Sequence, residues 1–150
     1  MTERSLLSYT EPMVGKYAAP LMFLAIALAP NACPAEHTVY YRYTVLGYVK
    51  DGSGAALSRA PVELVREKTG LSYRAATDAS GLYVIVARLG DESLGETLRL
   101  QVESHRATIV ARFDPADHTR ERGTRVDFVG ERAVETPTTF LATLQRFLAQ

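Results

Sequence analysis

From residue 36 onward, apolar and polar side chains alternate along the sequence with a period of two. The clearest example is LRLQVES at 98–104, in which leucine, leucine and valine take every second position and charged or amide side chains lie between them. Successive side chains of a β-strand point to opposite faces, so this segment predicts a strand with one dry face and one wet face. Turn-forming residues interrupt the pattern roughly every eight to twelve positions, which favours short strands in a sandwich or barrel.

Seven segments of this kind follow one another, with no convincing helical pattern between them. They are 39–49, 62–66, 71–77, 82–86, 98–104, 107–113 and 124–129. The segment at 82–86 is apolar at every position, so we expect it to lie centrally or to be covered on both faces. A polar loop, DPADHTRERG, occupies 114–123. Together the segments predict an all-β domain over 36–133, a seven-stranded antiparallel Greek-key β-sandwich.

The turn before the fourth segment has its own signature, TDASGLYV at 77–84. Asp78 is placed to accept hydrogen bonds from backbone N–H groups two and three residues further on. Gly81 can adopt the left-handed conformation that closes such a turn, because it has no Cβ. Tyr83 is then the first core side chain of the next strand. We predict a hairpin, with Thr77, Asp78, Gly81 and Tyr83 as its structural turn motif.

The first 35 residues differ from all that follow. Between 17 and 35 the only strongly polar side chain is Asn31, Lys16 stands just before this apolar run, and Cys33 and Ala35 provide a small-x-small exit. A positive flank, an apolar stretch and such an exit are typical of a secretory signal peptide. We therefore predict a leader over 1–35, cleaved near Ala35.

Two alternatives to cleavage stay open for this leader. The apolar run approaches the roughly 20 residues that span a bilayer, so it can remain as a membrane anchor. Cys33 can instead be lipidated, although Pro30 stands where a bacterial lipobox has leucine. A leader of ordinary size would begin at Met13 rather than Met1. Every alternative places the domain outside the cytoplasm, as a periplasmic, secreted, membrane-anchored or lipoprotein form. Cys33 is the only cysteine, so no intramolecular disulfide is expected.

The last residues, 134–150, predict a short amphipathic helix. Thr136 and Pro137 suit the N-cap and the first helical position. Apolar residues then recur at the spacing of one helix face, at Phe140, Leu141, Leu144, Phe147 and Leu148. The helix is expected to pack on the sandwich; docking to a partner or a membrane surface is the alternative, and it predicts an exposed apolar stripe over 140–148.

The charge balance argues against a polyanionic partner. Lys plus Arg and Asp plus Glu both number 17, so the formal net charge is zero. Nucleic-acid-binding domains carry a basic surface, and none is predicted here. Membrane contact is expected only through the leader or the C-terminal helix.

The order of strands and turns from Gly47 to Ile85 resembles the carboxypeptidase regulatory-like domains of the transthyretin-like (prealbumin-like) superfamily. The matching elements are a G-x-V strand, a D-x-x-G turn, an A-x-V-x-L strand and the T-D-x-x-G-x-Y turn; their residues are Gly47, Val49, Asp51, Gly54, Ala60, Val62, Leu64, Thr77, Asp78, Gly81 and Tyr83. The resemblance implies a Greek-key sandwich that in most family members has no catalytic role. Such modules accompany peptidases, outer-membrane receptors and surface proteins.

The signatures of catalytic proteins on this fold are missing from the sequence. Hydroxyisourate hydrolases end in Y-R-G-S, whereas this chain ends in RFLAQ. Intradiol dioxygenases hold iron with two tyrosines and two histidines, and no such pairs stand at a recognisable spacing here. Collagen-adhesin repeats cross-link a lysine to an asparagine, but the only asparagine, Asn31, lies in the leader. The three histidines, His37, His105 and His118, are scattered, so no metal site is predicted.

These observations predict an exported, non-catalytic β-sandwich without a cofactor, a binding or structural accessory at the cell envelope. A protein or a carbohydrate is the expected partner, the latter on Tyr40 and Tyr48, which are predicted to point outward. The oligomeric state stays open. The alternative is a small hydrolase or metal-binding protein that uses His105, His118 and loop arginines, and it requires these side chains to share one cleft.

Overall fold

The computed structural model describes residues 39–150, which form a two-layered β-sandwich carrying one short α-helix. The elements in chain order are β1 (Tyr41–Lys50), β2 (Pro61–Arg66), β3 (Ser72–Ala76), β4 (Leu82–Leu89), η1 (Asp91–Ser93), β5 (Thr97–Val102), β6 (His105–Val110), β7 (Arg122–Val129), β8 (Arg132–Glu135), η2 (Pro137–Thr139) and α1 (Phe140–Leu148). The predicted signal helix and its cleavage site lie outside the described residues. No helix within residues 39–150 is both long and apolar enough to cross a membrane.

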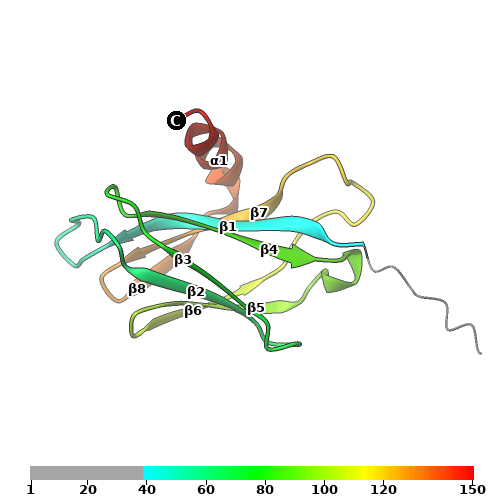
Figure 1. Ribbon diagram of the computed structural model, residues 1–150, viewed down its shortest axis with the longest axis horizontal. Coiled ribbons are helices and arrows are strands. Elements are labelled where there is room, and N and C mark those ends of the chain that lie inside the picture. Colours follow the sequence, from blue (N-terminus) through cyan, green and yellow to red (C-terminus); the bar gives the residue numbers. More distant parts are fainter. Residues whose placement is uncertain (1–38) are drawn as a thin grey trace, which may run out of the picture. The chain divides into compact units, whose positions relative to one another are not determined.

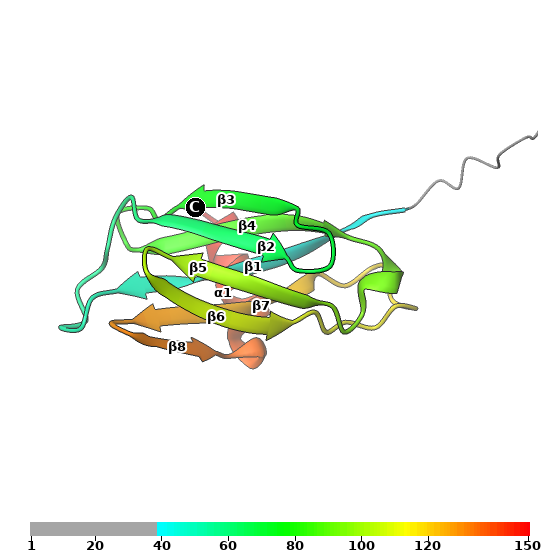
Figure 2. The same cartoon turned by 90° about the horizontal axis from the view of Figure 1, so that it is seen from below.

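The strands form two four-stranded sheets, ordered β4-β1-β7-β8 and β3-β2-β5-β6 (Figures 1 and 2). The predicted all-β sandwich is confirmed at this level, but two of its details are wrong. Residues 39–150 contain eight strands rather than seven, because β8 was missed. All four residues of β8 are exposed or half-buried, so they carry no apolar alternation to detect. In addition, β1 pairs with β7 in parallel, so the sandwich is not wholly antiparallel.

The core lies between the two sheets, where alternation predicted it. Leu98, Leu100 and Val102 on β5 are buried, whereas Arg99 on the same strand points away from the core. Each such side chain contributes about 1.5–3 kcal/mol when it is fully removed from water. The inner face of β1 adds Val45, and the other strands complete a single apolar cluster that spans both sheets.

The strand β1 is covered on both faces, which period-two reasoning did not predict. Its outward residue Leu46 is fully buried, together with Phe140 and Leu144 of α1 and the partly buried Val84 of β4. Figure 1 shows α1 on the outer side of the sheet that contains β1 and β7. The predicted helix is thus present and packs on the sandwich. The predicted side-chain cap is absent: Thr136 makes no capping hydrogen bond, and the chain enters α1 through a 3-10 turn.

The turn motif that follows β3 is a crossing between sheets and not the predicted hairpin, because β3 and β4 belong to different sheets. Asp78 Oδ1 accepts hydrogen bonds from the backbone N–H groups of Ser80 and Leu82. Gly81 has a φ of 80°, and a Cβ there would lie 2.6 Å from the carbonyl oxygen of Val49. Of the two alternatives for the fourth strand, a central position is wrong, since β4 is an edge strand. Its second face is covered only in part: Val84 packs against the cluster of Leu46 and α1, whereas Val86 is exposed.

The two remaining motif residues join the crossing to the core. The Thr77 hydroxyl accepts a hydrogen bond from the backbone N–H of Ala60 at 2.8 Å. The buried phenol of Tyr83 donates to the carbonyl oxygen of Val126 on β7, at 2.6 Å. Desolvation of this phenol raises the pKa of Tyr83 well above its usual range, so it remains a neutral donor. These contacts assign the motif to the architecture of the domain.

Candidate functional site

A cluster of charged and aromatic side chains lies at the end of the sandwich where β1 and β7 begin and β4 ends. We call it the Asp91 cluster; its members are Tyr41, Asp91, Phe113, His118 and Arg122. Tyr41 and Arg122 are the first residues of β1 and β7, and Asp91 opens η1 directly after β4. His118 and Phe113 come from the loop between β6 and β7. Three stretches distant in sequence, around residues 41, 91 and 113–122, therefore meet at one place.

Arg122 is the anchor of the Asp91 cluster. Its side chain is only 5% exposed, and its guanidinium carbon lies 4.6 Å from the ring centre of Tyr41 and 4.3 Å from that of Phe113. One terminal nitrogen donates to Asp91 Oδ1 at 2.8 Å, while Nε is buried without a hydrogen-bond partner in residues 39–150. A cation between aromatic rings and beside a carboxylate is well stabilised, so Arg122 is held in one position.

The loop that carries His118 is shaped by its own aspartates. Asp114 Oδ1 accepts from the backbone N–H of Ala116, and Asp117 Oδ1 accepts from Thr119. Short side chains that bond to the backbone two residues on fold the chain into tight turns. Arg122 then donates to the carbonyl oxygens of Asp114 and Asp117, both at 3.2 Å. The polar loop predicted from the sequence is thus present, and it is fastened to the buried guanidinium of Arg122.

His118 is oriented from two sides. Its ring stacks on the ring of Tyr41 with centroids 4.4 Å apart and planes 9° from parallel. Its Nε2 lies 2.9 Å from Asp91 Oδ2. Desolvation acts to raise the pKa of Asp91, but hydrogen bonds from Arg122 and His118 outweigh it and hold that pKa below its usual range. Asp91 is therefore a carboxylate at neutral pH, and Nε2 of His118 carries the proton it accepts.

When Nε2 donates to Asp91, the opposite nitrogen of this imidazole is the one that can accept a proton. Nδ1 of His118 makes no hydrogen bond within residues 39–150, and the side chain is 44% exposed. A neutral imidazole that donates through one nitrogen keeps a lone pair on the other. A histidine oriented by a carboxylate in this way is suited to act as a general base.

A polar pocket of about 280 Å³ adjoins this imidazole. Its lining residues are Tyr40, Tyr41, Arg42, His118, Thr119, Arg120, Glu121 and Arg122. Besides the anchored Arg122, the lining contains Arg42, which pairs with Glu121 at 3.2 Å, and Arg120, which pairs with Asp117 at 3.4 Å. Both of these arginines are largely exposed, with side chains 73% and 84% accessible. The pocket thus presents exposed cations beside an oriented histidine, an arrangement that suits a small anion.

The structure does not bring together His105 and His118, the two histidines that the alternative prediction of a hydrolase or metal-binding protein requires. His118 stacks on Tyr41 at the start of β1. His105 lines a second pocket with Lys50, the last residue of β1. Ten residues of extended strand separate these places by about 30 Å. His37 lies outside the described residues. The condition set for the alternative, one cleft shared by His105 and His118, is therefore not met, and only His118 lies among loop arginines.

Sequence reasoning missed the other members of the Asp91 cluster. The period of two along 39–49 predicts Tyr41 on the core face of its strand, together with Val39, Tyr43 and Val45; it is instead half-buried beneath His118 and Arg122. Asp91 stands in the segment RLGDES and carries no motif. The one available signal was the composition of the polar loop, which concentrates His118 and two arginines, Arg120 and Arg122, within 114–123.

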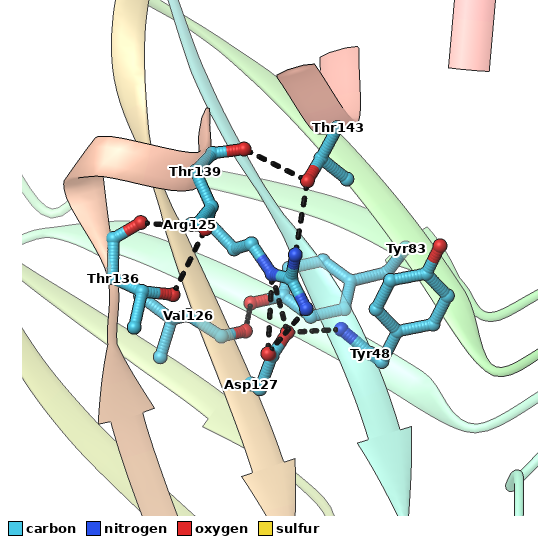
Figure 3. A network of polar contacts seen from close by, with 8 residues as sticks. All are labelled: Tyr48, Tyr83, Arg125, Val126, Asp127, Thr136, Thr139 and Thr143. Carbon is cyan, nitrogen blue, oxygen red and sulfur yellow. Dashed lines mark hydrogen bonds and ion pairs between the residues drawn. The ribbon is translucent and has the colours of Figure 1, made fainter. Parts of the chain in front are cut away.

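A second polar network, drawn in Figure 3, fastens the C-terminal helix to the sheet. Arg125 donates to both carboxylate oxygens of Asp127 and, at 3.0 Å, to the hydroxyl of Thr143 on α1. Asp127 also accepts from the backbone N–H of Tyr48 at 2.9 Å. Its donors and acceptors satisfy one another, so we assign it to the attachment of α1.

The predicted outward tyrosines do not form a common platform. Tyr40 is 53% exposed and lines the polar pocket. Tyr48, near the far end of β1, lies under the guanidinium of Arg125 at 5.3 Å. Tyr43 between them is in the core, where burial raises its pKa to about 12.

Comparison with known proteins gives a limited likeness. No protein-family model and no curated protein matches the chain. Among solved structures it is similar to the dioxygenase domain of a dioxygenase carbohydrate-binding protein fusion from Streptomyces sp. SirexAA-E, with 17% identity and a TM-score of 0.41 over 63% of this chain and 82% of that one. It is also similar to chlorocatechol 1,2-dioxygenase from Pseudomonas putida, with 15% identity, a TM-score of 0.43 and coverage of 62% and 61%. Catechol 1,2-dioxygenase from Acinetobacter sp. ADP1 follows with 14% identity, a TM-score of 0.38 and coverage of 61% and 45%.

These neighbours are enzymes, and this finding contradicts the predicted non-catalytic binding module and the prediction of no enzymatic activity. The expectations of a non-catalytic binding module and of no enzymatic activity are withdrawn. No family model matches the chain, so the resemblance to carboxypeptidase regulatory-like domains stays a prediction that no comparison supports. At identities of 14 to 17%, the likeness does not identify a reaction for this chain. A reaction has to be inferred from the side chains of the chain itself.

The residues described do not fit the iron site of an intradiol dioxygenase. That site needs two tyrosines and two histidines around one ion, and His105 and His118 lie at opposite ends of β1. Within residues 39–150, no group of three or more His, Cys, Asp or Glu side chains could hold a metal ion. The reaction proposed below therefore does not involve iron.

Proposed function

We propose that the domain is a small hydrolase whose general base is His118, acting on a compact ester or related acyl compound that carries a negative charge. The observation that supports the proposal is the shared carboxylate of Asp91, which bonds His118 Nε2 at 2.9 Å and Arg122 at 2.8 Å. This contact fixes the imidazole and directs its basic lone pair to Nδ1.

Each residue has a definite role in this reaction. Nδ1 of His118 takes a proton from a water molecule as the water oxygen bonds to the acyl carbon. The bond between that carbon and the leaving alcohol oxygen breaks, and the imidazolium returns its proton to the alcohol. Asp91 stabilises the transient imidazolium, and Arg42 and Arg120 hold the negative charge of the substrate.

The size and polarity of the pocket support a small, charged substrate. A volume of about 280 Å³ is at the lower end for ligand sites. Its arginines already have carboxylate partners at the surface, and exposed pairs of this kind contribute only about 0–1 kcal/mol, so an anion can replace them.

The test compares the hydrolysis rate of 4-acetoxybenzoate with that of its uncharged methyl ester. The rate is measured as the release of the phenol. We expect faster hydrolysis of the charged compound, and a fall of about 100-fold or more in kcat for His118→Gln. His105→Gln is the matched control at the other end of β1 and should retain the wild-type rate. Equal loss in both variants, or no hydrolysis above the buffer rate in the wild type, would refute the proposal.

We further propose that the domain acts outside the cytoplasm, on the strength of the apolar run and the small-x-small exit at 17–35. Mass spectrometry of the mature N-terminus tests this: a chain that begins near Glu36 supports export. A cytoplasmic chain that retains residues 1–35 would contradict it.

A further inference from the structure

The strand β4 has one edge bonded to β1 and one free edge. The N–H of Val49 donates to the carbonyl oxygen of Gly81 at 2.8 Å, in the same register as the β1–β4 pairing. Hydrogen-bonded pairs recur at every second residue of an antiparallel ladder. The main-chain groups of residues 83, 85, 87 and 89 therefore bond to β1, and those of 82, 84, 86 and 88 point to the free edge.

Both ends of this free edge are already bonded by other groups. At one end the N–H of Leu82 donates to Asp78 Oδ1, and the carbonyl oxygen of Leu82 accepts from the Asp78 N–H. At the other end the N–H of Arg88 donates to the Tyr73 hydroxyl at 3.3 Å, and Arg66 donates to the carbonyl oxygen of Arg88 at 3.2 Å. The only charged residue of β4 is thus at a closed end.

The middle of the edge, at Val84 and Val86, is open. Within the described part of the chain the N–H and C=O groups of these two residues have no hydrogen-bond partner, and the Val86 side chain is 46% exposed. The other edge strands, β3, β6 and β8, carry the exposed arginines Arg74, Arg106 and Arg132. Charged side chains on an edge strand oppose the addition of another strand, so the β4 edge is the one best suited to such pairing.

The helix α1 extends the apolar surface toward this edge. Phe140 lies against Gly123 of β7, and Leu144 shares a cluster with Val84 of β4, so the helix crosses the sheet from β7 to β4. Leu148 lies one turn beyond Leu144 on the same helix face and is 70% exposed. Figure 2 shows the C-terminus on the side of the sandwich where β3 and β4 run. Exposed apolar side chains of the helix and the strand therefore flank the open main-chain groups.

We infer that this edge is a dimer interface, in which β4 of a second copy pairs antiparallel with β4 about a two-fold axis at Ile85. In this register Val84 lies opposite Val86 of the second copy, and each of the two valine pairs exchanges both of its N–H···O=C bonds. An extended peptide would find only two open residues between closed ends. A second copy presents an edge of the same length with the same apolar side chains, as an isologous interface requires. The inference does not rest on the proposed hydrolysis.

Sedimentation equilibrium and NMR hydrogen exchange of the full chain test this interface. We expect a monomer–dimer equilibrium with a dissociation constant of roughly 10 µM to 1 mM, because an interface this small is weak. The amides of Val84 and Val86 should exchange more slowly as the protein concentration rises, because they become hydrogen-bonded in the dimer. A monomer throughout this range, or exchange at these two amides that does not depend on concentration, would overturn the inference.

Val86→Lys and Val134→Lys form a matched pair of variants. Both valines lie on edge strands of the same sheet and are 46% and 47% exposed, so neither substitution should unfold the domain. Val86→Lys should weaken the dimer at least about ten-fold, because a lysine on an edge strand opposes pairing and the two-fold axis brings two of them close together. Val134→Lys should keep the wild-type dissociation constant, and Leu148→Ser should raise it about five-fold. Dimerisation that survives Val86→Lys, or equal weakening by both lysine variants, would contradict the interface.

Discussion

The ion pair between Arg66 and Glu96 is the contact whose removal should most clearly destabilise the domain. Nε and one terminal nitrogen of Arg66 each donate to a Glu96 oxygen at 2.7 Å. The guanidinium also reaches the carbonyl oxygen of Arg88 on β4, so it joins β2 of one sheet to β4 of the other. Both charged side chains are almost fully buried, with 6% and 4% exposure.

Glu96→Ala leaves this guanidinium buried without its counter-charge. Removing one partner of a buried pair typically costs about 3–5 kcal/mol in the free energy of unfolding, because the remaining charge has lost its compensation. For a domain of this size each kcal/mol corresponds to roughly 4 °C in Tm, so we expect a fall of about 12–20 °C. Urea unfolding and calorimetry of wild type and variant at neutral pH measure the two quantities.

Glu63 provides the matched control for this substitution. It also pairs with an arginine, Arg74, at 2.9 Å, but the Arg74 side chain is 78% exposed. Exposed pairs contribute about 0–1 kcal/mol, so Glu63→Ala should change Tm by only a few degrees. If Glu63→Ala and Glu96→Ala destabilised the domain equally, the reasoning from burial would be refuted. The double variant Arg66→Met, Glu96→Leu should be less destabilised than Glu96→Ala, because it leaves no buried charge.

The stability contributed by Glu96 should also depend on pH. The hydrogen bond from Arg66 is the main cause that lowers the pKa of Glu96 below its ordinary 4.5. A carboxyl group with a lowered pKa in the folded state stabilises the fold above its unfolded pKa. That stabilisation is lost as the pH falls from about 4.5 through the lower folded value, so the difference between wild type and Glu96→Ala should shrink there. A difference that stays constant from pH 7 to pH 3 would contradict this.

Two further substitutions test the packing of the core. Tyr83→Phe removes the donor to the buried carbonyl oxygen of Val126 and should cost about 1–3 kcal/mol in urea unfolding, with the fold preserved; an unchanged midpoint would contradict the role of the phenol. Gly123→Ala would place a Cβ 2.0 Å from the carbonyl oxygen of Thr44 and 2.5 Å from the Phe140 ring, so we expect the free energy of unfolding to fall by more than about 3 kcal/mol. Gly52→Ala is the control: its Cβ would have no atom within 4 Å, so the free energy of unfolding should change by less than about 0.5 kcal/mol. Similar losses in both glycine variants would refute the proposed close approach.

Much of the fold could be predicted from local patterns, because burial against one opposing sheet imposes a period of two. That is why Leu98, Leu100 and Val102 are buried as predicted. It is also why the predicted strand ends differ from the observed ones by only a few residues. The pattern fails where a strand has two buried faces or none. Leu46 breaks the alternation of β1 because α1 covers the outer face of that strand, and β8 has no buried face that could reveal it.

The candidate site could be predicted only in part, because its members are joined by topology and not by sequence spacing. His118 and the loop arginines were identified by composition, yet their partners Tyr41 and Asp91 lie 77 and 27 positions away from His118. The parallel pairing of β1 with β7, which brings Tyr41 to Arg122, leaves no local signal. The same topology places His105 far from His118, which no spacing argument could have excluded.

The position of β1 has a consequence for how the chain folds. This strand is hydrogen-bonded on one edge to β4 and on the other to β7, which follows it by 79 residues along the chain. Its outer side chain Leu46 is buried by α1, the last of the described elements in chain order. Among the elements of residues 39–150, β1 is thus synthesised before the others but enclosed only when α1 is present. Such distant pairing is slow, so until β7 and α1 have been synthesised this apolar strand stays exposed to aggregation.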